Sequence, residues 1–304
     1  MNYTDEEFYG NKQNTVLENG NIVEAGKQEE KKEEKEPKLA LAMVTTFAKT
    51  LIILICSIFY IVATVVGLSP KSGIKVFEFI GSEKAALSCY ERVYQKSGTL
   101  ADLYNVVQKS ISIKNHNKTS KYIKELQSKN SYNEFCIEVN DAVLQVTEKK
   151  YLAYVGDLDG YLVSQNIIAK YLSGNKDEAL ILAISDLEND NIYSFGLSAY
   201  FSCLENDDSL TEEQKNLKIS DISNIIVDSS LKVLDKIKER RTSADSDLGN
   251  GGFNDKILRL YTSLKIENAL LKIYEATNEE DLANQTRSQI SELQSEYDAE
   301  INNW

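Results

Sequence analysis

The scarcity of proline is the strongest constraint on the fold of this chain. Its only prolines are Pro37 and Pro70, and the sequence from Lys71 to Trp304 contains none. Turns of mixed and all-β domains often use proline, whereas a helix interior excludes it because proline lacks a backbone N–H and clashes with the preceding turn. The same stretch is rich in Leu, Ile, Lys, Glu, Asn and Ser, which long helices tolerate. We therefore expect an all-α fold for residues 71–304.

A long uncharged run precedes this region. Residues 50–68, "TLIILICSIFYIVATVVGL", contain no charged side chain. As a helix rising about 1.5 Å per residue, the run would measure ~28 Å, close to the ~30 Å of a bilayer's hydrocarbon core. Lys49 directly precedes the run, and its flexible side chain can extend back to the membrane interface. The run predicts one transmembrane helix.

Three other interpretations of the run fit less well. A cleaved signal peptide has a short basic segment before a shorter apolar stretch, but here 38 residues come first. A lipoprotein signal places a small residue before its cysteine, whereas Ile55 precedes Cys56. A helix in a soluble core would show polar residues every third or fourth position, and this run has few. An uncleaved span remains the prediction.

Composition divides the chain into three regions. Residues 1–38 have few large apolar side chains and end in an alternating charged run, so we expect a disordered tail. Residues 39–70 hold the transmembrane helix and its flanks, with 50–68 as the core. Residues 71–304 form the helical region. Within it we expect helices near 74–80, 83–97, 100–113, 118–129, 132–149, 151–172, 176–188, 191–205, 211–241, 254–276 and 279–301.

Capping signals place several of these helix boundaries. A Ser, Thr or Asn followed three residues later by an acid can satisfy the free backbone N–H groups of a first helical turn. Three such pairs occur: Thr99 with Asp102, Ser131 with Glu134, and Asn175 with Glu178. Gly98 and Gly174 mark helix ends, where glycine accepts a left-handed conformation. Connections of two to five residues then predict an array of antiparallel helical hairpins.

Part of this array resembles tetratricopeptide repeats. Glu83–Ser97 is similar to the second helix of a repeat, with Ala86 at the small position where paired helices approach closely. Ala101–Ile113 is similar to the next first helix. Asn115 falls where the turn glycine would be, and Ser120 lies 34 residues after Ala86, which is the period of this family.

A second fragment, residues 171–191, is similar to the turn and second helix of another repeat, with Gly174, Ala179 and Leu182 at matching positions. The resemblance implies an α-solenoid whose concave face binds peptides or partner proteins without catalysis. The 59 residues from Ser120 to Ala179 break the 34-residue period. An unrelated helical array is therefore the alternative.

No residue set in the sequence indicates catalysis, a cofactor or a metal. His116 is the only histidine, which excludes three-histidine metal sites and disfavours Ser-His-Asp and Cys-His arrangements. The stretches 157–160 and 245–252 combine aspartate with glycine but lack the twelfth-position acid of a calcium loop, so they predict turns. No glycine-rich phosphate motif occurs. The four cysteines form no CxxC pair, and we expect them to be reduced packing residues.

Tyrosine is abundant, and four tyrosines between residues 151 and 171 are candidates for contacting a partner. Tyrosine offers a rigid contact surface with a polar tip. The alternative is that these rings pack between helices with their hydroxyls at the surface. The candidates are Tyr151, Tyr154, Tyr161 and Tyr171.

Charge is distributed unevenly along the helical region. Residues 71–150 hold 13 Lys and Arg against 9 Asp and Glu, a net of +4, and residues 151–304 hold 14 against 28, a net of −14. A cluster of lysines near the membrane anchor, opposed only by Glu125, predicts contact with anionic lipid headgroups. An ordinary solvated helix face is the alternative. The cluster consists of Lys109, Lys114, Lys118, Lys121, Lys124 and Lys129.

The same charges bear on orientation and partner class. Five lysines lie within twenty residues before the apolar run and three follow it closely, which favours a cytoplasmic N-terminus and an exported helical domain. The overall net charge of −13 argues against nucleic-acid binding. We expect a single-pass, membrane-anchored, non-catalytic helical scaffold that binds a protein or peptide. Its alternatives are a structural subunit of an envelope or secretion assembly and, third, a membrane-tethered enzyme.

Overall fold

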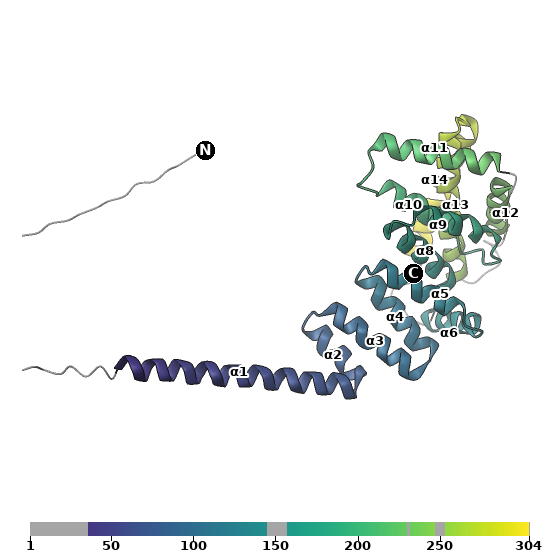
Figure 1. Ribbon diagram of the computed structural model, residues 1–304. Coiled ribbons are helices and arrows are strands. Elements are labelled where there is room, and N and C mark those ends of the chain that lie inside the picture. The colour runs from purple at the N-terminus through teal and green to yellow at the C-terminus, as the bar shows by residue number, and fades with distance from the viewer. Residues whose placement is uncertain (1–35, 145–156, 230–231, 247–252, 304) are drawn as a thin grey trace, which may run out of the picture. The chain divides into compact units, whose positions relative to one another are not determined.

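The computed structural model describes residues 36–144, 157–229, 232–246 and 253–303. All regular elements within these ranges are helices, with no β-strand among them, which confirms the predicted all-α class (Figure 1). The chain divides into two units, Met1–Phe59 and Tyr60–Trp304. The predicted disordered tail lies almost entirely outside the described residues.

The first helix, α1 (Glu36–Leu68), contains the predicted span. Its segment Met43–Thr64 is long and apolar enough to cross a membrane, and none of it is buried against the rest of the protein. The hydroxyls of Thr50, Ser57 and Thr64 each donate to the carbonyl four residues earlier. These polar groups are therefore satisfied within the helix itself, as a hydrocarbon environment requires.

The candidate span begins seven residues before the predicted core of 50–68 and includes Lys49. The preceding segment, Met43–Ala48, is itself uncharged, so the apolar stretch continues on the N-terminal side of the lysine. A lysine within a span must extend its side chain toward an interface.

The second unit is an array of helices connected mostly by short turns. Its members are α2 (Pro70–Phe79), α3 (Glu83–Ser97), α4 (Leu100–Ser112), α5 (His116–Gln127), α6 (Tyr132–Leu144), α8 (Leu158–Leu172), α9 (Lys176–Ser185), the 3-10 helix η2 (Asp186–Glu188), α10 (Gly196–Glu205), α11 (Glu212–Asp228), α12 (Val233–Ser246), α13 (Phe253–Ala276) and α14 (Glu280–Asn302). Pro70 occupies the first position of α2, where its missing N–H costs nothing.

Several predicted boundaries were right and others were wrong. Thr99 caps α4 by accepting from the backbone N–H of Asp102, as predicted. Asn175 precedes α9, but its side chain donates to the Ser173 hydroxyl and makes no capping hydrogen bond, and the Glu178 side chain pairs with Lys124 and Lys170. The predicted helix 211–241 is instead two helices: α11 ends at Asp228 and α12 begins at Val233. The predicted loop at 242–254 is shorter than expected, because α12 continues to Ser246 and α13 begins at Phe253.

Four hairpins share one three-residue connection. The pairs α2–α3, α4–α5, α8–α9 and α13–α14 are each joined by three residues, of which the middle one has positive φ. These middle residues are Gly81, Lys114, Gly174 and Asn278. In each turn the backbone N–H groups of all three residues donate to carbonyls of the helix just completed, which satisfies its last carbonyl groups.

A small buried residue follows each of these turns at the same distance. Five residues after the positive-φ position stand Ala86, Thr119, Ala179 and Ala283, each no more than 3% exposed. A small side chain here lets the second helix of each hairpin approach its neighbours closely. The recurrence corrects the sequence alignment, because the left-handed residue is Lys114 rather than Asn115, and Thr119 rather than Ser120 is equivalent to Ala86.

The Lys114 turn provides a direct stability prediction. A lysine at a φ of 55° bears a steric cost that glycine, as at Gly81 and Gly174, does not. We expect Lys114→Gly to raise the free energy of unfolding by about 1 kcal/mol, measured by urea denaturation of the full chain in detergent micelles. Lys114→Ala, which keeps the steric cost, is the control and should give no gain; equal gains from both variants would show that the backbone conformation is not the cause.

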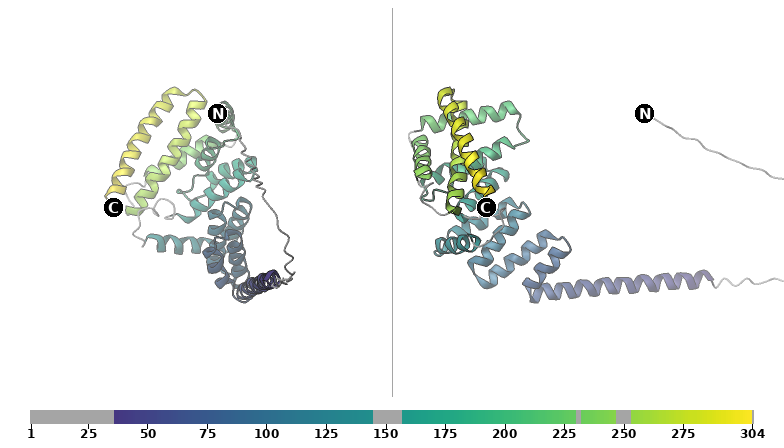
Figure 2. Two further views of the ribbon diagram at one scale, coloured as in Figure 1. Left: turned by 90° about the vertical axis from the view of Figure 1, so that its left-hand side faces the viewer. Right: turned by 180° about the vertical axis from the view of Figure 1, so that it is seen from behind.

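The apolar core consists of two clusters. The first is formed by α3, α4, α5, α6 and the start of α8, and includes Leu103 and Ile123, both fully buried. The second joins α8 through α14, and includes Phe195 and Phe201, also fully buried. In Figure 2, the last two helices, α13 and α14, lie side by side as an antiparallel pair. Helix α8 contributes to both clusters and so connects them.

Candidate binding groove

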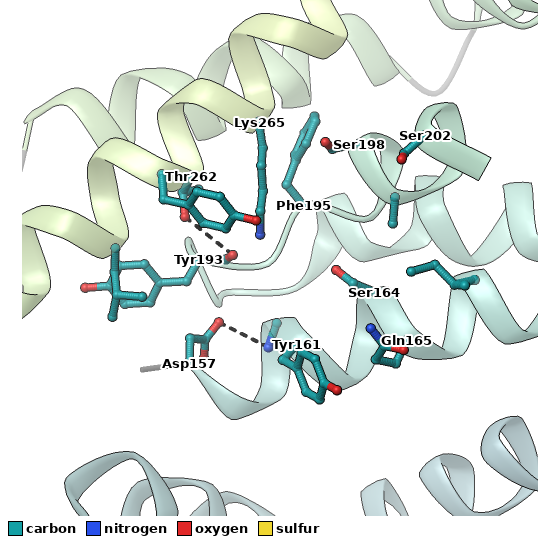
Figure 3. A pocket seen from close by; sticks show the side chains of 15 residues that line it. Asp157, Tyr161, Ser164, Gln165, Tyr193, Phe195, Ser198, Ser202, Thr262 and Lys265 are labelled. Atoms are coloured by element: carbon teal, nitrogen blue, oxygen red, sulfur yellow. Dashed lines mark hydrogen bonds between the residues drawn. The ribbon is translucent and has the colours of Figure 1, made fainter. Parts of the chain in front are cut away.

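A cavity of about 280 Å³ opens between α8, the segment 193–195, α10 and α13. Figure 3 shows side chains from these elements directed toward its interior. Tyr161, Tyr193 and Tyr261 form aromatic walls, and Ile168 and Leu258 add apolar surface. We call this space the cavity.

The start of α8 is fixed by Asp157. Its carboxylate accepts from the backbone N–H of Gly160 at 3.1 Å and from the amide of Asn191 at 3.0 and 3.2 Å. The aspartate–glycine stretch predicted as a turn is thus a helix N-cap that also binds the segment after η2. Burial raises the pKa of Asp157, and the hydrogen bond from Asn191 acts in the opposite direction.

Gly160 lets this segment pass close to α8. A Cβ atom there would lie 2.3 Å from the Asp157 carboxylate, 3.1 Å from the Tyr193 carbonyl oxygen and 3.2 Å from the Ser194 Cα. We expect Gly160→Ala to lower the free energy of unfolding by about 2 kcal/mol, because both backbone and N-cap must move. The urea midpoint would measure the loss. Gly67→Ala, at a glycine with open space, is the control, and equal effects of the two would contradict the steric explanation.

The segment 186–194, which leads into the cavity wall at residues 193–195, is held by one buried arginine. Arg240 of α12 donates to the carbonyls of Asn191 at 2.6 Å, Ser194 at 2.7 Å and Asp186 at 3.1 Å, and also to that of Asn189. It is 6% exposed. A planar guanidinium can reach several carbonyls at once, which a single ammonium cannot. Arg240 therefore determines the path of this segment.

The Asp186 side chain also binds this segment. Its carboxylate accepts from the Ser194 hydroxyl and the Gly196 N–H, both at 2.7 Å. Burial raises the pKa of this carboxyl, while these two hydrogen bonds and Arg240 favour its charged form. The acid and the arginine together fix both sides of the loop.

Lys265 of α13 extends into the cavity (Figure 3). Its ammonium group lies 4.4 Å from the ring centroid of Tyr261, a cation–π contact. No hydrogen bond or ion pair to any other described residue accompanies it. Burial lowers the pKa of Lys265 to about 8, against the weaker opposing influence of Asp157 and Asp186. Both carboxylates accept hydrogen bonds from other groups, and neither pairs with this lysine at contact distance.

Four other polar side chains around the cavity also lack a hydrogen-bond partner among the described residues. Ser164, Gln165, Ser198 and Ser202 have no side-chain hydrogen bond to another residue in the described ranges. Ser164 and Gln165 come from α8, and Ser198 and Ser202 come from α10, so donors face the interior from two helices. The cavity is therefore lined by donors directed at a shared space.

A second hollow of about 340 Å³ continues from the cavity along α10, α13 and α14. The two share Ser198, Ser202, Tyr261 and Lys265. We call this second hollow the outer groove. Its far end is formed by Gln294 and Tyr297 of α14, and Lys272 on its edge pairs with Glu205.

The structure separates the four candidate tyrosines. Tyr151 and Tyr154 lie outside the described residues. Tyr161 lines the cavity, and burial raises its pKa. Tyr171 is 2% exposed, packs edge-on against Tyr200 and donates to Asp207 at 2.9 Å. A ring so enclosed offers no surface to a partner, so Tyr171 is a packing residue.

The predicted lysine cluster is opposed by more acids than Glu125. Lys109 pairs with Glu78 and Glu83, Lys118 with Glu91, and Lys124 with Glu178. Lys129 lies 3.7 Å from Glu125, Lys121 lies over the ring of Tyr122, and Lys114 occupies the left-handed turn. The expectation of an acid-poor basic surface was wrong, because acids distant in sequence fold back onto these lysines.

The remaining candidates take structural places. His116 begins α5, and burial and Lys114 lower its pKa. Cys89 and Cys136 are buried, and all four cysteines are free thiols. Within the described ranges no group of His, Cys, Asp or Glu is arranged to hold a metal ion.

The sequence offered tyrosines between residues 151 and 171 as partner contacts but nothing on the other side of the cavity. Lys265, Tyr261 and Thr262 come from α13, about 90 residues further along the chain. Their pattern in the sequence is that of an ordinary amphipathic helix. No local signal distinguishes Lys265 from the other lysines.

Comparison with known proteins returned no match among protein-family models, curated proteins or solved structures.

Proposed function

We propose that this protein is a membrane-anchored helical scaffold that binds a partner protein or peptide in the outer groove and cavity, without catalysis. One observation carries the proposal. An elongated hollow with tyrosine walls and uncommitted polar side chains runs along α8, α10, α13 and α14. Rigid aromatic surface beside adaptable hydrogen-bond donors is the composition that protein-binding sites favour.

The anchor in this proposal is α1. The apolar segment Met43–Thr64 is unburied and long enough to span a bilayer. The lysine bias before the apolar run supports an N-terminus in the cytoplasm and an exported helical unit.

The helical unit is further proposed to be a degenerate tetratricopeptide-like solenoid. The shared three-residue turn and the small residue five positions later in four hairpins support this. Helices α8 and α13, each the first of its hairpin, line the cavity.

Site-directed photocrosslinking in the native membrane tests the proposal. A benzoylphenylalanine placed at Tyr161 or Ser202 would sample the cavity and its mouth. The same group at Ile181 of α9 or Glu213 of α11, both exposed and outside the two hollows, provides the control. We expect one discrete adduct from the first pair of positions and none from the second.

Adducts of equal size and yield from all four positions would contradict a groove-specific partner.

Fusions of a periplasmic-type phosphatase and of a cytoplasm-dependent fluorescent protein after Trp304 test the orientation. Phosphatase activity without fluorescence is expected; the reverse result would place the helical unit in the cytoplasm.

A further inference from the structure

We infer that the cavity is a binding site for a small aromatic carboxylate, whose anionic group is held by Lys265 and whose ring lies against the tyrosine walls. This inference goes beyond the proposed scaffold function and does not depend on a protein partner. It rests on four features of the described residues: a cavity of about 280 Å³, one cation in it without a counter-ion, neutral donors on two of its helices, and aromatic walls.

The charge of the ligand follows from Lys265. Its nearest acids are Asp157, which is bound by Gly160 and Asn191, and Asp186, which is bound by Ser194 and Gly196. Neither acid hydrogen-bonds the lysine in the described structure. Even a partly buried ammonium without a counter-ion is costly, and an anion entering the cavity would reduce that cost.

The donors around the ammonium suit a carboxylate. Ser198 and Ser202 from α10 and Ser164 and Gln165 from α8 line the same cavity and have no other partners in the described ranges. A carboxylate accepts several hydrogen bonds through its two oxygens, so one cation and neighbouring hydroxyls can satisfy it together.

The size and remaining walls indicate an aromatic body. A volume of about 280 Å³ is at the lower end of ordinary small-molecule pockets. Tyr161, Tyr193 and Tyr261 present rings to it, and Ile168 and Leu258 add apolar contacts. Aromatic rings favour edge-to-face and offset-stacked neighbours. A ligand with one ring and one carboxylate therefore matches both parts of the lining.

The test uses the full chain in detergent micelles and 4-fluorobenzoate as the probe, observed by fluorine NMR. We expect saturable binding that weakens at least tenfold for the neutral 4-fluorobenzamide and at least tenfold in Lys265→Met. Lys256→Met, on the same helix but outside both hollows, where its ammonium pairs with Glu300, is the matched control and should bind within twofold of the native chain.

Calorimetry at pH 8 in two buffers, Tris and HEPES, measures the protons taken up on binding, which a purely structural role of Lys265 would not change. Because burial lowers the pKa of Lys265 to about 8, an anion that restores the charged form should be accompanied by uptake of about half a proton per ligand. Lys265→Met should show no uptake. Uptake by both proteins would assign the proton to another group and overturn the role of this lysine.

Two competitors distinguish the source of the carboxylate. A tripeptide ending in phenylalanine that binds more tightly than 4-fluorobenzoate would identify a chain end, and would overturn the assignment of a small molecule. Displacement of the probe by inorganic phosphate at equal concentration would overturn the aromatic part of the assignment. Absence of saturable binding by 4-fluorobenzoate would overturn the inference as a whole, and would leave the photocrosslinking result unaffected.

Discussion

Lys265→Met is expected to raise the free energy of unfolding by about 2 kcal/mol at pH 7. Holding the lysine charged in the cavity lowers its pKa from 10.5 to about 8. At about 1.4 kcal/mol per pKa unit this is a penalty of roughly 3 kcal/mol. Methionine fills a similar volume without charge but loses the cation–π contact with Tyr261, worth about 1 kcal/mol. Urea denaturation of the full chain in detergent micelles measures the gain.

The gain should depend on pH in a defined direction. Below about pH 8 the lysine is protonated in both the folded and the unfolded chain, so the whole penalty applies. Between about pH 8 and 10.5 the folded chain has released the proton and the unfolded chain still holds it, so stability of the native chain rises with pH. The advantage of Lys265→Met should therefore be constant below pH 8 and disappear as the pH approaches 10.5.

Lys272→Met serves as the control for this prediction. Its ammonium is paired with a partly exposed Glu205, and such surface pairs contribute about 0–1 kcal/mol. We expect a small loss without the pH dependence. A destabilised Lys265→Met, or a gain that persists above pH 10.5, would show that the lysine is not held at a cost. A residue that reduces stability while lining a cavity is typical of a binding site.

Arg240→Met is expected to lower the free energy of unfolding by about 4 kcal/mol. The substitution removes hydrogen bonds to the four carbonyls of residues 186, 189, 191 and 194 and the attraction to Asp186. Leaving buried polar groups unpaired costs about 1–3 kcal/mol for a neutral group and 3–5 kcal/mol for a buried ion pair. The urea midpoint of the full chain would report the loss.

The same substitution should affect the cavity, because residues 193–195 form one of its walls. Arg240→Lys keeps the charge but not the planar fork, and we expect it to recover less than half of the lost stability. Arg287→Met, which breaks an exposed pair with Glu275, is the control and should change stability by no more than about 0.5 kcal/mol. A loss below 1 kcal/mol in Arg240→Met would mean that the segment is held by other contacts.

Local features of the sequence predicted much of the fold. The proline-free region, the cap at Thr99 and the helix ends at Gly98 and Gly174 identify helices correctly, because each acts within one or two helical turns. The break between α11 and α12 was not predicted, since residues 229–232 contain neither proline nor glycine. The left-handed conformation of Lys114 was likewise missed, because lysine is not a residue that ordinarily adopts it.

The candidate site depended more on distant contacts. Tyr161, one of the candidates for contacting a partner, lines the cavity, whereas Tyr171, ten residues later on the same helix, lies in the core. The two differ in which neighbouring helix packs over them, and that information is not local. Likewise Lys124 pairs with Glu178, which lies 54 residues later in the chain, and no local pattern predicts that pair.

The sequence by itself determined the helical class, the apolar helix long enough to span a membrane, and the helix ends at Gly98 and Gly174, because backbone propensity and periodicity act over a few residues. Only the tertiary structure decided which lysines are paired, which tyrosines are buried and which side chains share the cavity. Lys265 shows the reason. Its contact with Tyr261 is local, one turn away on α13, but its partial burial and its place opposite α8 arise from packing segments more than 90 residues apart in the chain.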